Sequence, residues 1–434
     1  MIPMLHENER GISLVMVIVV GAFLSLMGYV TVSTVVMDTR TSASYLQAVQ
    51  AFWLAESGIE LTYRWIRFQD PPPAGTAAFL HYNNISAGGG TYTVSVDPDD
   101  NNPSTYLKKY RIVAVGRVAD VERTIEIETE ATTFNRYAYL TGDEGGTIWF
   151  NSGDLIEGPL HSNDRISIVG SPVFMGKVTS SSNSFHQGNP YEPVFQQGFH
   201  LGVPPVNFPT PQEVMDNYYA SNPDPPVLSI DSRFGRRSSV DFNSDGTVTY
   251  NIWHYNWRGH VVYDAQDQVV NLTDLNGLIY VDGDVKVEGT VNGVVTLIAT
   301  EDISISGDIV YEGSDSDGKP LHDCDDMLGL VSHQDIIVEN NSGNRDDVVI
   351  DAALLALGNS FTVESYYSGS DRGDLTIWGS LSQKVRGPVG TFGYYGSTGY
   401  HKDYHYDTRF LDTGPPYFPA TGQYHFNYWK EITE

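Results

Sequence analysis

The sequence predicts an α+β protein in which one very long amino-terminal helix is followed by a small antiparallel sheet and then by a large β-rich domain. Three observations support this prediction. The chain carries no charged side chain from Ile12 to Met37, and it has no proline between Ile12 and Pro71. From about residue 91 onward, apolar and polar residues alternate in short runs, as they do in half-buried strands. With 434 residues, the chain is long enough for the helix and one large or two modest domains.

The amino-terminal helix is expected over residues 12–68. Its uncharged part, residues 12–37, would be about 39 Å long, which exceeds the ~30 Å hydrocarbon core of a bilayer. An apolar stripe then continues through Leu54, Gly58, Leu61, Trp65 and Phe68. Because these residues are three or four positions apart, they lie on one face of a helix that extends beyond the membrane. Pro71 and the two prolines after it end the helix, since proline lacks the backbone N–H that a helix needs.

The apolar run does not fit a cleaved secretory signal, because the apolar part of such a signal is only about 7–15 residues long. An ordinary single-pass anchor with a helical stalk stays open on these residues alone. The residues that carry a family resemblance are Arg10-Gly11, Ile12-Ser13-Leu14 and Ala55-Glu56-Ser57-Gly58. With the uncharged run between them, they resemble the amino-terminal region of type IV pilus minor pilins and type II secretion pseudopilins, particularly the PilX-like group.

In that family, a prepilin peptidase removes a leader and the new amino terminus is methylated. The resemblance therefore implies that residues 1–11 are a leader, and that processing takes place between Gly11 and Ile12. It also implies that Glu56 and Gly58 belong to a helix that packs inside a filament. The expected partners are the inner membrane, prepilin peptidase and other pilins or pseudopilins. The expected location is the bacterial inner membrane, with a single pass and an extracytoplasmic carboxyl-terminal domain that can enter a surface filament.

Two features depart from the family pattern. The leader lacks the usual cluster of basic residues, and the fifth residue after the cleavage point is Met16, where major pilins carry a glutamate. That glutamate pairs with the amino terminus of a neighbouring subunit, since a buried charge is unfavourable unless it is matched. We therefore expect Met16 to lie in the filament helix of a tip or low-copy subunit.

Residues 69–132 are predicted to form a small antiparallel sheet, because apolar and polar side chains alternate there with a period of two. The expected strands are 91–96, 109–117 and 121–130. They should pack on Leu54, Leu61 and Trp65 of the helix, as a sheet with one apolar face packs on an apolar helix stripe.

Residues 133–434 form the predicted β-rich domain. A polar residue followed by two apolar residues, one position apart, recurs in phrases that begin at Asp164, Asp284, Asp302, Asp335, Ser360 and Asp374. Stacked short strands of this kind would bury a continuous apolar column, so we expect a right-handed β-helix with insertions; a β-sandwich is the alternative. Residues 180–276 are expected as an insert, with one helix after Thr210. Residues 158–180 (GPLHSNDRISIVGSPVFMGKVTS) and 400–419 (YHKDYHYDTRFLDTGPPYFP) also resemble an uncharacterised domain that often follows pilin-like helices in bacterial envelope proteins.

The chain is strongly acidic, with 54 Asp and Glu against 25 Lys and Arg and a formal net charge of −29. Nucleic acid is therefore not expected as a partner, because phosphate binding needs a basic surface. Cys324 is the one cysteine, so no intrachain disulfide can form.

Few residues suggest a catalytic or metal-binding site. Asp241, Asn243 and Asp245 match the first half of a calcium loop, but the twelfth position is Ile252 where a glutamate is expected. A β-hairpin turn explains the same residues, so no cofactor is expected beyond a candidate Ca²⁺ ion. The twelve histidines show no HExxH spacing.

The function predicted from the sequence is that of a non-enzymatic minor pilin-like subunit, which assists the assembly of a type IV pilus or a type II secretion pseudopilus. It would present a β-rich domain outside the cytoplasm. The alternative is a membrane-anchored β-helix protein that binds or cleaves polysaccharide. In that case Asp284, Asp302 and Asp335 could line up on one outer face, although a structural role in closing each turn explains them equally.

Overall fold

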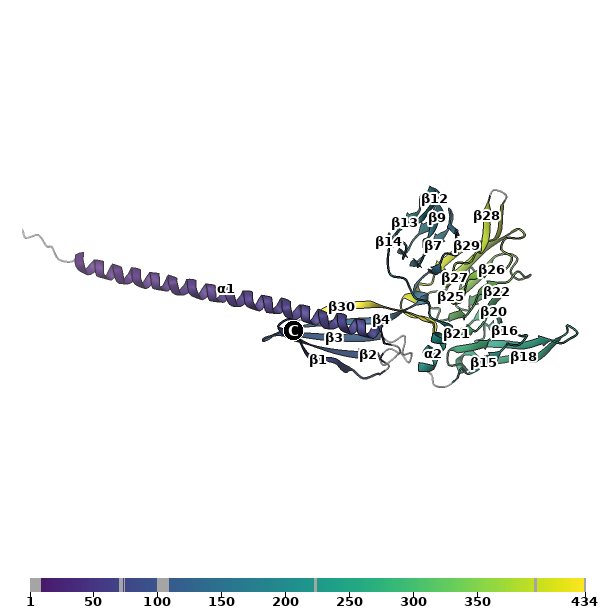
Figure 1. Cartoon of the computed structure of the whole chain (residues 1–434), viewed down its shortest axis with the longest axis horizontal. Helices are drawn as coiled ribbons and strands as arrows, with labels where there is room; N and C mark the ends of the chain where they lie inside the picture. Colours follow the sequence, from purple (N-terminus) through teal and green to yellow (C-terminus); the bar gives the residue numbers. More distant parts are fainter. Residues whose placement is uncertain are drawn as a thin grey trace, which may run out of the picture.

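The protein consists of a long helical rod attached to a β-rich body (Figure 1). The computed structural model describes residues 9–69, 73, 75–99, 109–221, 225–393 and 396–432. The rod is helix α1 (Glu9–Arg67), which is followed by strands, a second helix and short 3₁₀ turns. The predicted α+β class and the long amino-terminal helix are therefore confirmed. Most of the expected leader, residues 1–8, lies outside the described residues.

The carboxyl-terminal part of α1 packs on a five-stranded antiparallel sheet. In spatial order its strands are β1 (Phe79–Ala87), β2 (Gly90–Pro98), β3 (Lys109–Val118), β4 (Val121–Thr133) and β30 (Ala420–Ile432). The three strands expected from the period-two pattern correspond to β2, β3 and β4. Their alternate side chains, including Val94, Ile112 and Ile127, are buried against the helix.

The buried face of α1 differs in part from the expected stripe. Its buried residues are Ala51, Leu54, Ala55, Gly58, Ile59, Thr62 and Ile66. Leu54, Gly58 and the half-buried Trp65 contact the sheet side as expected, whereas Leu61 and Phe68 face solvent. The helix is rotated so that small residues meet the sheet, which allows the two backbones to approach closely.

The β-rich body is a stack of coils whose strands pair in parallel, and the first of its three ladders runs the full length of the stack. In spatial order this ladder is β15 (Leu228–Asp231), β19 (Leu278–Asp282), β21 (Val294–Ala299), β23 (Met327–Ser332), β25 (Val348–Ala356), β27 (Asp371–Val385), β5 (Tyr139–Asp143), β8 (Leu160–Ser162), β11 (Val178–Ser180) and β14 (Phe199–Leu201).

The second and third ladders form the other sides of the coils. The second contains β16 (Arg236–Asn243), β20 (Val285–Val291), β22 (Ile303–Tyr311), β24 (Ile336–Val338) and β26 (Phe361–Val363). The third begins with the ends of β20 and β22 and continues through the starts of β25 and β27. It then contains β29 (Gly396–Tyr406), β7 (Leu155–Ile156), β10 (Val173–Phe174) and β13 (Val194–Phe195). Parallel pairing between successive coils is the pattern of a β-helix, and the antiparallel sheets of a β-sandwich would not produce it.

The coils do not stack in chain order. Leu381 of β27 pairs with Tyr139 of β5, so the segment 139–201 continues the stack beyond the end of the segment 228–385. The sequence predicts an insert at residues 180–276, but most of its strands belong to the coils themselves. Its first strands, β12 to β14, complete the coils at one end, while β15 and β16 begin the other end.

The whole β-rich domain is inserted between two neighbouring strands of the small sheet. Thr133 of β4 pairs with Ala420 of β30, and the Phe134 N–H donates to the Pro419 carbonyl at 3.1 Å. The domain thus spans residues 134–419, which differs from the expected 133–434. Residues 420–432 belong to the small sheet instead, because Tyr424 packs into the core beneath α1.

The remaining elements cover the outside of the stack or extend it. Helix α2 (Pro211–Ser221) starts at the expected place and packs Val214, Met215 and Tyr218 on the outer face of the first ladder. Strands β6 (Trp149–Phe150), β9 (Ser167–Gly170) and β12 (His186–Tyr191) pair in parallel as a separate three-stranded sheet, which forms one side of the coils in residues 139–201 and places Phe150 and Ile168 in the core. β17 (Thr247–Tyr255) and β18 (Val261–Asn271) extend β16 as an antiparallel sheet, and β28 (Gly390–Gly393) pairs with β29.

Candidate functional site

The amino-terminal part of α1 is a free apolar surface. Within the described residues, Ser13–Arg67 is the helix long and apolar enough to cross a membrane, and none of its most apolar window is buried. Met16 is 67% exposed. The hydroxyls of Thr31 and Thr34 donate to the carbonyls of Met27 and Val30 at 2.8 and 2.9 Å, so the helix satisfies these polar groups itself.

The expected processing residues lie within α1, where Gly11 and Ile12 are helical. The other expected filament residues are placed further along the helix, at the contact with the small sheet. The Trp429 indole N–H of β30 donates to the Glu56 carboxylate at 2.9 Å. Glu56 therefore joins the helix to the last strand of the chain.

Gly58 and Gly116 permit the close contact between α1 and the small sheet. A Cβ added at Gly58 would lie 2.7 Å from Cγ2 of Val94. At Gly116 of β3, it would lie 1.9 Å from the Ala51 carbonyl oxygen, inside the van der Waals contact distance. The strand therefore runs directly against the helix backbone at this point, with no room for a side chain.

The candidate calcium residues lie on the β16–β17 hairpin. Asp245 is in the turn, where its carboxylate accepts the Thr247 N–H at 3.1 Å and the Thr247 hydroxyl at 2.6 Å. The Asn243 amide donates to the hydroxyls of Thr247 and Thr249, both at 3.0 Å, and Asp241 belongs to β16. Among the residues that the structure describes, no three His, Cys, Asp or Glu side chains are grouped to hold a metal ion.

Asp284, Asp302 and Asp335 do line up, one above another in successive coils. The Asp284 carboxylate accepts the Asp302 N–H at 3.0 Å, and the Asp302 carboxylate accepts the Asp335 N–H at 3.0 Å. The Asp335 carboxylate in turn accepts the Ser360 N–H at 2.6 Å. Burial raises the pKa of Asp302, and the neighbouring Asp335 and Asp284 carboxylates add to this. Each of these carboxylates therefore bonds to the backbone of the next coil.

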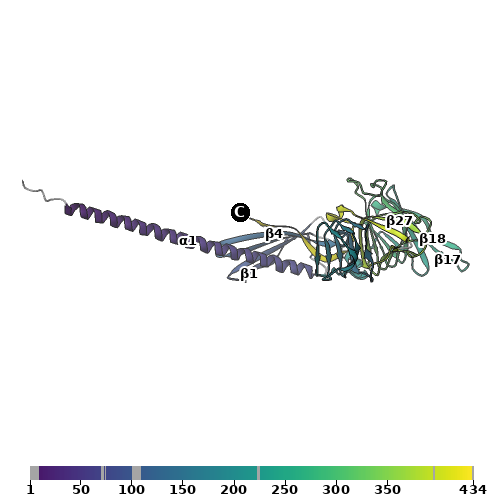
Figure 2. The same cartoon turned by 90° about the horizontal axis from the view of Figure 1, so that it is seen from above.

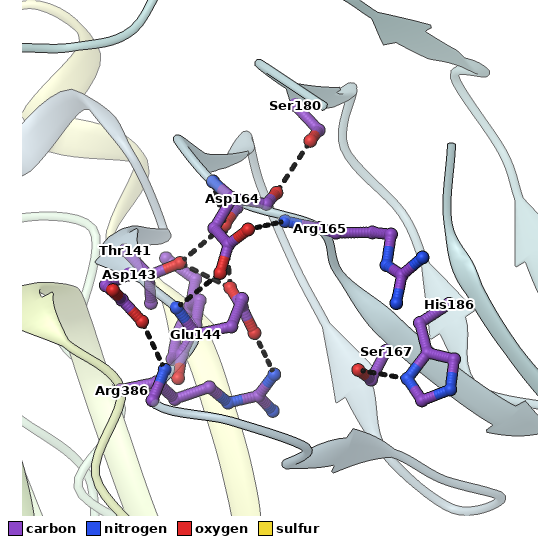
Figure 3. Close-up of polar contacts among 12 residues, drawn as sticks. Thr141, Asp143, Glu144, Asp164, Arg165, Ser167, Ser180, His186 and Arg386 are labelled. Atoms are coloured by element: carbon purple, nitrogen blue, oxygen red, sulfur yellow. Dashed lines mark hydrogen bonds and ion pairs between the residues drawn. The ribbon is translucent and has the colours of Figure 1, made fainter. Parts of the chain in front are cut away.

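A buried ion pair joins the two parts of the stack where β27 meets β5 (Figure 3). The Arg386 guanidinium lies 2.7 Å from the Glu144 carboxylate, and both side chains are almost fully buried. The hydroxyls of Thr141 and Ser162 donate to the same carboxylate at 2.5 and 2.7 Å. The Arg386 backbone N–H also donates to the Asp143 carbonyl at 2.8 Å. We call these residues the seam cluster.

A second cation lies beside the seam cluster. Cζ of Arg386 is 4.0 Å from the centroid of the Phe150 ring, and Nζ of Lys402 is 5.6 Å from the same centroid. Burial, together with the nearby Arg386, lowers the pKa of Lys402 to about 8, although Asp154 acts in the opposite direction. Together with the seam cluster, these side chains connect neighbouring coils of the stack.

Asp351 of β25 is another buried carboxyl, and it should make the stability of the chain depend on pH. Burial raises its pKa to about 7, although the Tyr311 N–H and the Ser314 hydroxyl donate to it. In an unfolded chain the pKa would be about 3.9. The folded state therefore holds a proton that the unfolded state releases, so the free energy of unfolding should fall as the pH rises from about 4 to above 7.

We expect Asp351→Asn to remove most of this pH dependence and to stabilise the chain at pH 8 relative to the parent. Each unit of pKa difference corresponds to about 1.4 kcal/mol. Urea unfolding between pH 4 and 8 would measure the slope, with the exposed Asp325→Asn as a control that keeps it. If the stability of the Asp351→Asn chain changes with pH as steeply as that of the parent, Asp351 is not the source of the pH dependence.

The seam cluster and Asp351 had no signal in the sequence that identifies them. Arg386 stands in a turn-like phrase, VRGPVG, that is typical of an exposed charge, and Glu144 stands in an acidic, glycine-rich stretch. The one available hint is the repeated phrase, which indicates stacked strands but not which coils are neighbours.

Comparison with known families and structures gives limited matches. A family model described as a domain of unknown function, DUF4900, matches residues 105–183, which include β3, β4 and the strands from β5 to β11. No curated protein matches the chain in sequence. Among solved structures, the chain is similar to the competence-associated pilin ComZ from Thermus thermophilus, with 13% identity and a TM-score of 0.32 over 89% of this chain and 98% of that chain. A TM-score of this size is too low to equate residues of the two chains.

Proposed function

We propose that the chain is a minor pilin-like subunit of a type IV pilus or a type II secretion pseudopilus. The observation that carries this proposal is the division of α1 into two parts. Residues 13–37 carry no charge, are mostly apolar and are almost entirely exposed, whereas the helix from Ala51 onward is fixed to the small sheet. An exposed apolar helix of this length needs a bilayer or other apolar helices around it.

In this proposal, α1 first anchors the chain in the inner membrane, with the β-rich domain outside the cytoplasm. A prepilin peptidase then cuts between Gly11 and Ile12, and α1 packs against other pilins or pseudopilins. Because Met16 offers no carboxylate to a neighbouring amino terminus, the subunit occupies the tip or a few positions of the filament. The β-rich domain acts without catalysis, since the aligned aspartates already bond to backbone N–H groups.

We expect filaments sheared from cells that express this chain to contain it far below the abundance of the main subunit, with methylated Ile12 at its amino terminus. Gly11→Val should block cleavage and remove the chain from the filaments, because a branched side chain replaces the small residue at the cut. Peptide mass spectrometry of the sheared fraction would measure both results.

Gly21→Val is a matched control, since it changes a glycine in the same helix away from the cleavage point. An uncut chain beside an active prepilin peptidase, or filaments composed of this chain alone, would contradict the proposal.

A further inference from the structure

A three-stranded sheet of β16, β17 and β18 projects at the end of the molecule opposite the free end of α1 (Figures 1 and 2). Its inner face is part of the core, because Val240 of β16 and Val248 of β17 are fully buried there. Side chains alternate along each strand, so the odd-numbered residues of β16 and β17 point outward.

The outer face of this sheet is lined with aromatic side chains. Arg237, Trp253 and Tyr263 are direct partners across the three strands, and Tyr255 pairs with Val261 in the next outward row. The turn beyond them carries Trp257, which is 86% exposed. We call this surface the aromatic face, and its residues are Arg237, Trp253, Tyr255, Trp257, Arg258 and Tyr263.

The two arginines of the aromatic face stack on its rings. Cζ of Arg237 lies 5.3 Å from the Tyr255 centroid, and Cζ of Arg258 lies 4.5 Å from the Trp257 centroid. Within the described residues, neither guanidinium has a carboxylate at ion-pair distance. Nearby Arg233 and Arg236 differ, because they pair with Asp231, Asp264 and Asp282.

These unpaired cations are unusual in a chain with a formal net charge of −29. No acidic residue occurs between Gly246 and Tyr263. The next residue, Asp264, already pairs with Arg236 and His254 at 3.3 and 3.0 Å, and Asp241 and Asp267 lie nearer the base of the sheet. Aromatic rings and guanidinium groups that remain exposed together, with no carboxylate paired to the charge, are typical of a recognition surface.

We propose that the aromatic face binds a linear polysaccharide that carries carboxylate groups. Outward side chains along β17 are about 6.8 Å apart, so Trp253 and Tyr255 offer two successive aromatic rings along the strand, and Trp257 in the turn beyond adds a third. The apolar faces of sugar rings can stack on such platforms, while Arg237 and Arg258 can pair with carboxylates on the sugars. The sheet lies far from the free end of α1 (Figure 2), and Tyr255, Trp257 and Tyr263 are exposed in the full chain.

A nucleic acid fits these residues less well. Single strands also stack on aromatic side chains, but they carry a phosphate at every nucleotide, and affinity depends on neutralising many of them. Two unpaired guanidinium groups on a chain of net charge −29 cannot do so. A sugar acid carries its carboxylate on the same ring that stacks, so guanidinium groups beside the aromatic rings can pair with it directly. The inference does not depend on assembly into a filament.

The test uses the full chain in phospholipid nanodiscs, since maltoside detergents would themselves offer sugars to the face. Tryptophan fluorescence and calorimetry would measure binding of a β-mannuronate hexamer, cellohexaose and a dT₁₂ oligonucleotide. We expect the mannuronate hexamer to bind, cellohexaose to bind more weakly and dT₁₂ not to bind. Trp257→Ala should weaken mannuronate binding about tenfold or more. Arg258→Gln should weaken it while leaving cellohexaose binding unchanged.

Tyr367→Ala is the matched control, because it removes another strongly exposed aromatic ring outside the aromatic face and should leave binding unchanged. Circular dichroism would verify that each variant is folded. The proposal would be overturned by four results: no binding of the mannuronate hexamer, equal binding in Trp257→Ala, tighter binding of dT₁₂, or self-association of the chain that Trp257→Ala abolishes.

Discussion

Replacing Arg386 with methionine should destabilise the β-rich domain by about 3–5 kcal/mol, the loss expected when one partner of a buried ion pair is removed. Methionine fills much of the same space against Phe150, so the loss comes mainly from the charge. The Glu144 carboxylate would remain buried, held by the hydroxyls of Thr141 and Ser162 but without a cation. Urea unfolding of the full chain in detergent micelles, followed by circular dichroism, would measure the change.

A double substitution would test whether the loss of stability comes from the unmatched charge. Arg386→Met combined with Glu144→Gln should be less destabilising than the sum of the two single changes, because neither charge is then left unmatched. Arg111→Met is the control, since it breaks an exposed pair with Asp97 that is worth about 0–1 kcal/mol. Equal losses in Arg386→Met and Arg111→Met would show that the seam does not depend on the ion pair.

Gly116→Val should displace α1 from the small sheet. Overpacking of a filled core usually destabilises by about 1–3 kcal/mol, and more where the neighbour cannot move. Here the obstacle is the carbonyl oxygen of Ala51, a backbone atom of the helix, so no side-chain rotation relieves the contact. The separate core of the β-rich domain should remain folded, because it shares no buried apolar residue with the core beneath α1.

Limited trypsin digestion would test this, because Arg64 and Arg67 in the last turn of α1 should become cleaved once the helix separates from the sheet. Gly28→Ala is the matched control: a Cβ at Gly28 meets nothing within 4 Å, and alanine favours a helix over glycine. If Gly116→Val resists trypsin as well as Gly28→Ala does, the close contact is not required.

The long helix and the central strands of the small sheet could be predicted because their signals are local. The absence of charge from Ile12 to Met37 and of proline before Pro71 indicates one long helix, and the period of two in β2, β3 and β4 requires no knowledge of distant residues. The buried face of the helix was harder, because two neighbouring stripes are both apolar. The sheet contacts the stripe with Ala51, Ala55 and Gly58, since small residues allow the closer approach.

The order of the coils and the seam cluster could not be predicted from the sequence. Each repeated phrase predicts the same kind of short strand. The phrases therefore indicate that coils are present, but they do not indicate which coils are neighbours in the stack. The pairing of β27 with β5, and therefore the meeting of Arg386 and Glu144, depends on contacts between residues more than half the chain apart. The calcium interpretation of Asp241, Asn243 and Asp245 and the processing of Gly11 and Ile12 remain predictions.

The insertion of the β-rich domain between β4 and β30 determines how the molecule would respond to mechanical tension. Both ends of the domain leave the small sheet side by side, with Thr133 paired to Ala420. A force that pulls on the helix is resisted by the contact of α1 with the sheet and does not pass through the stacked coils. A ligand held by the coils would instead pull on β4 and β30 together, at the end where Thr133 pairs with Ala420, so both strands would share the load.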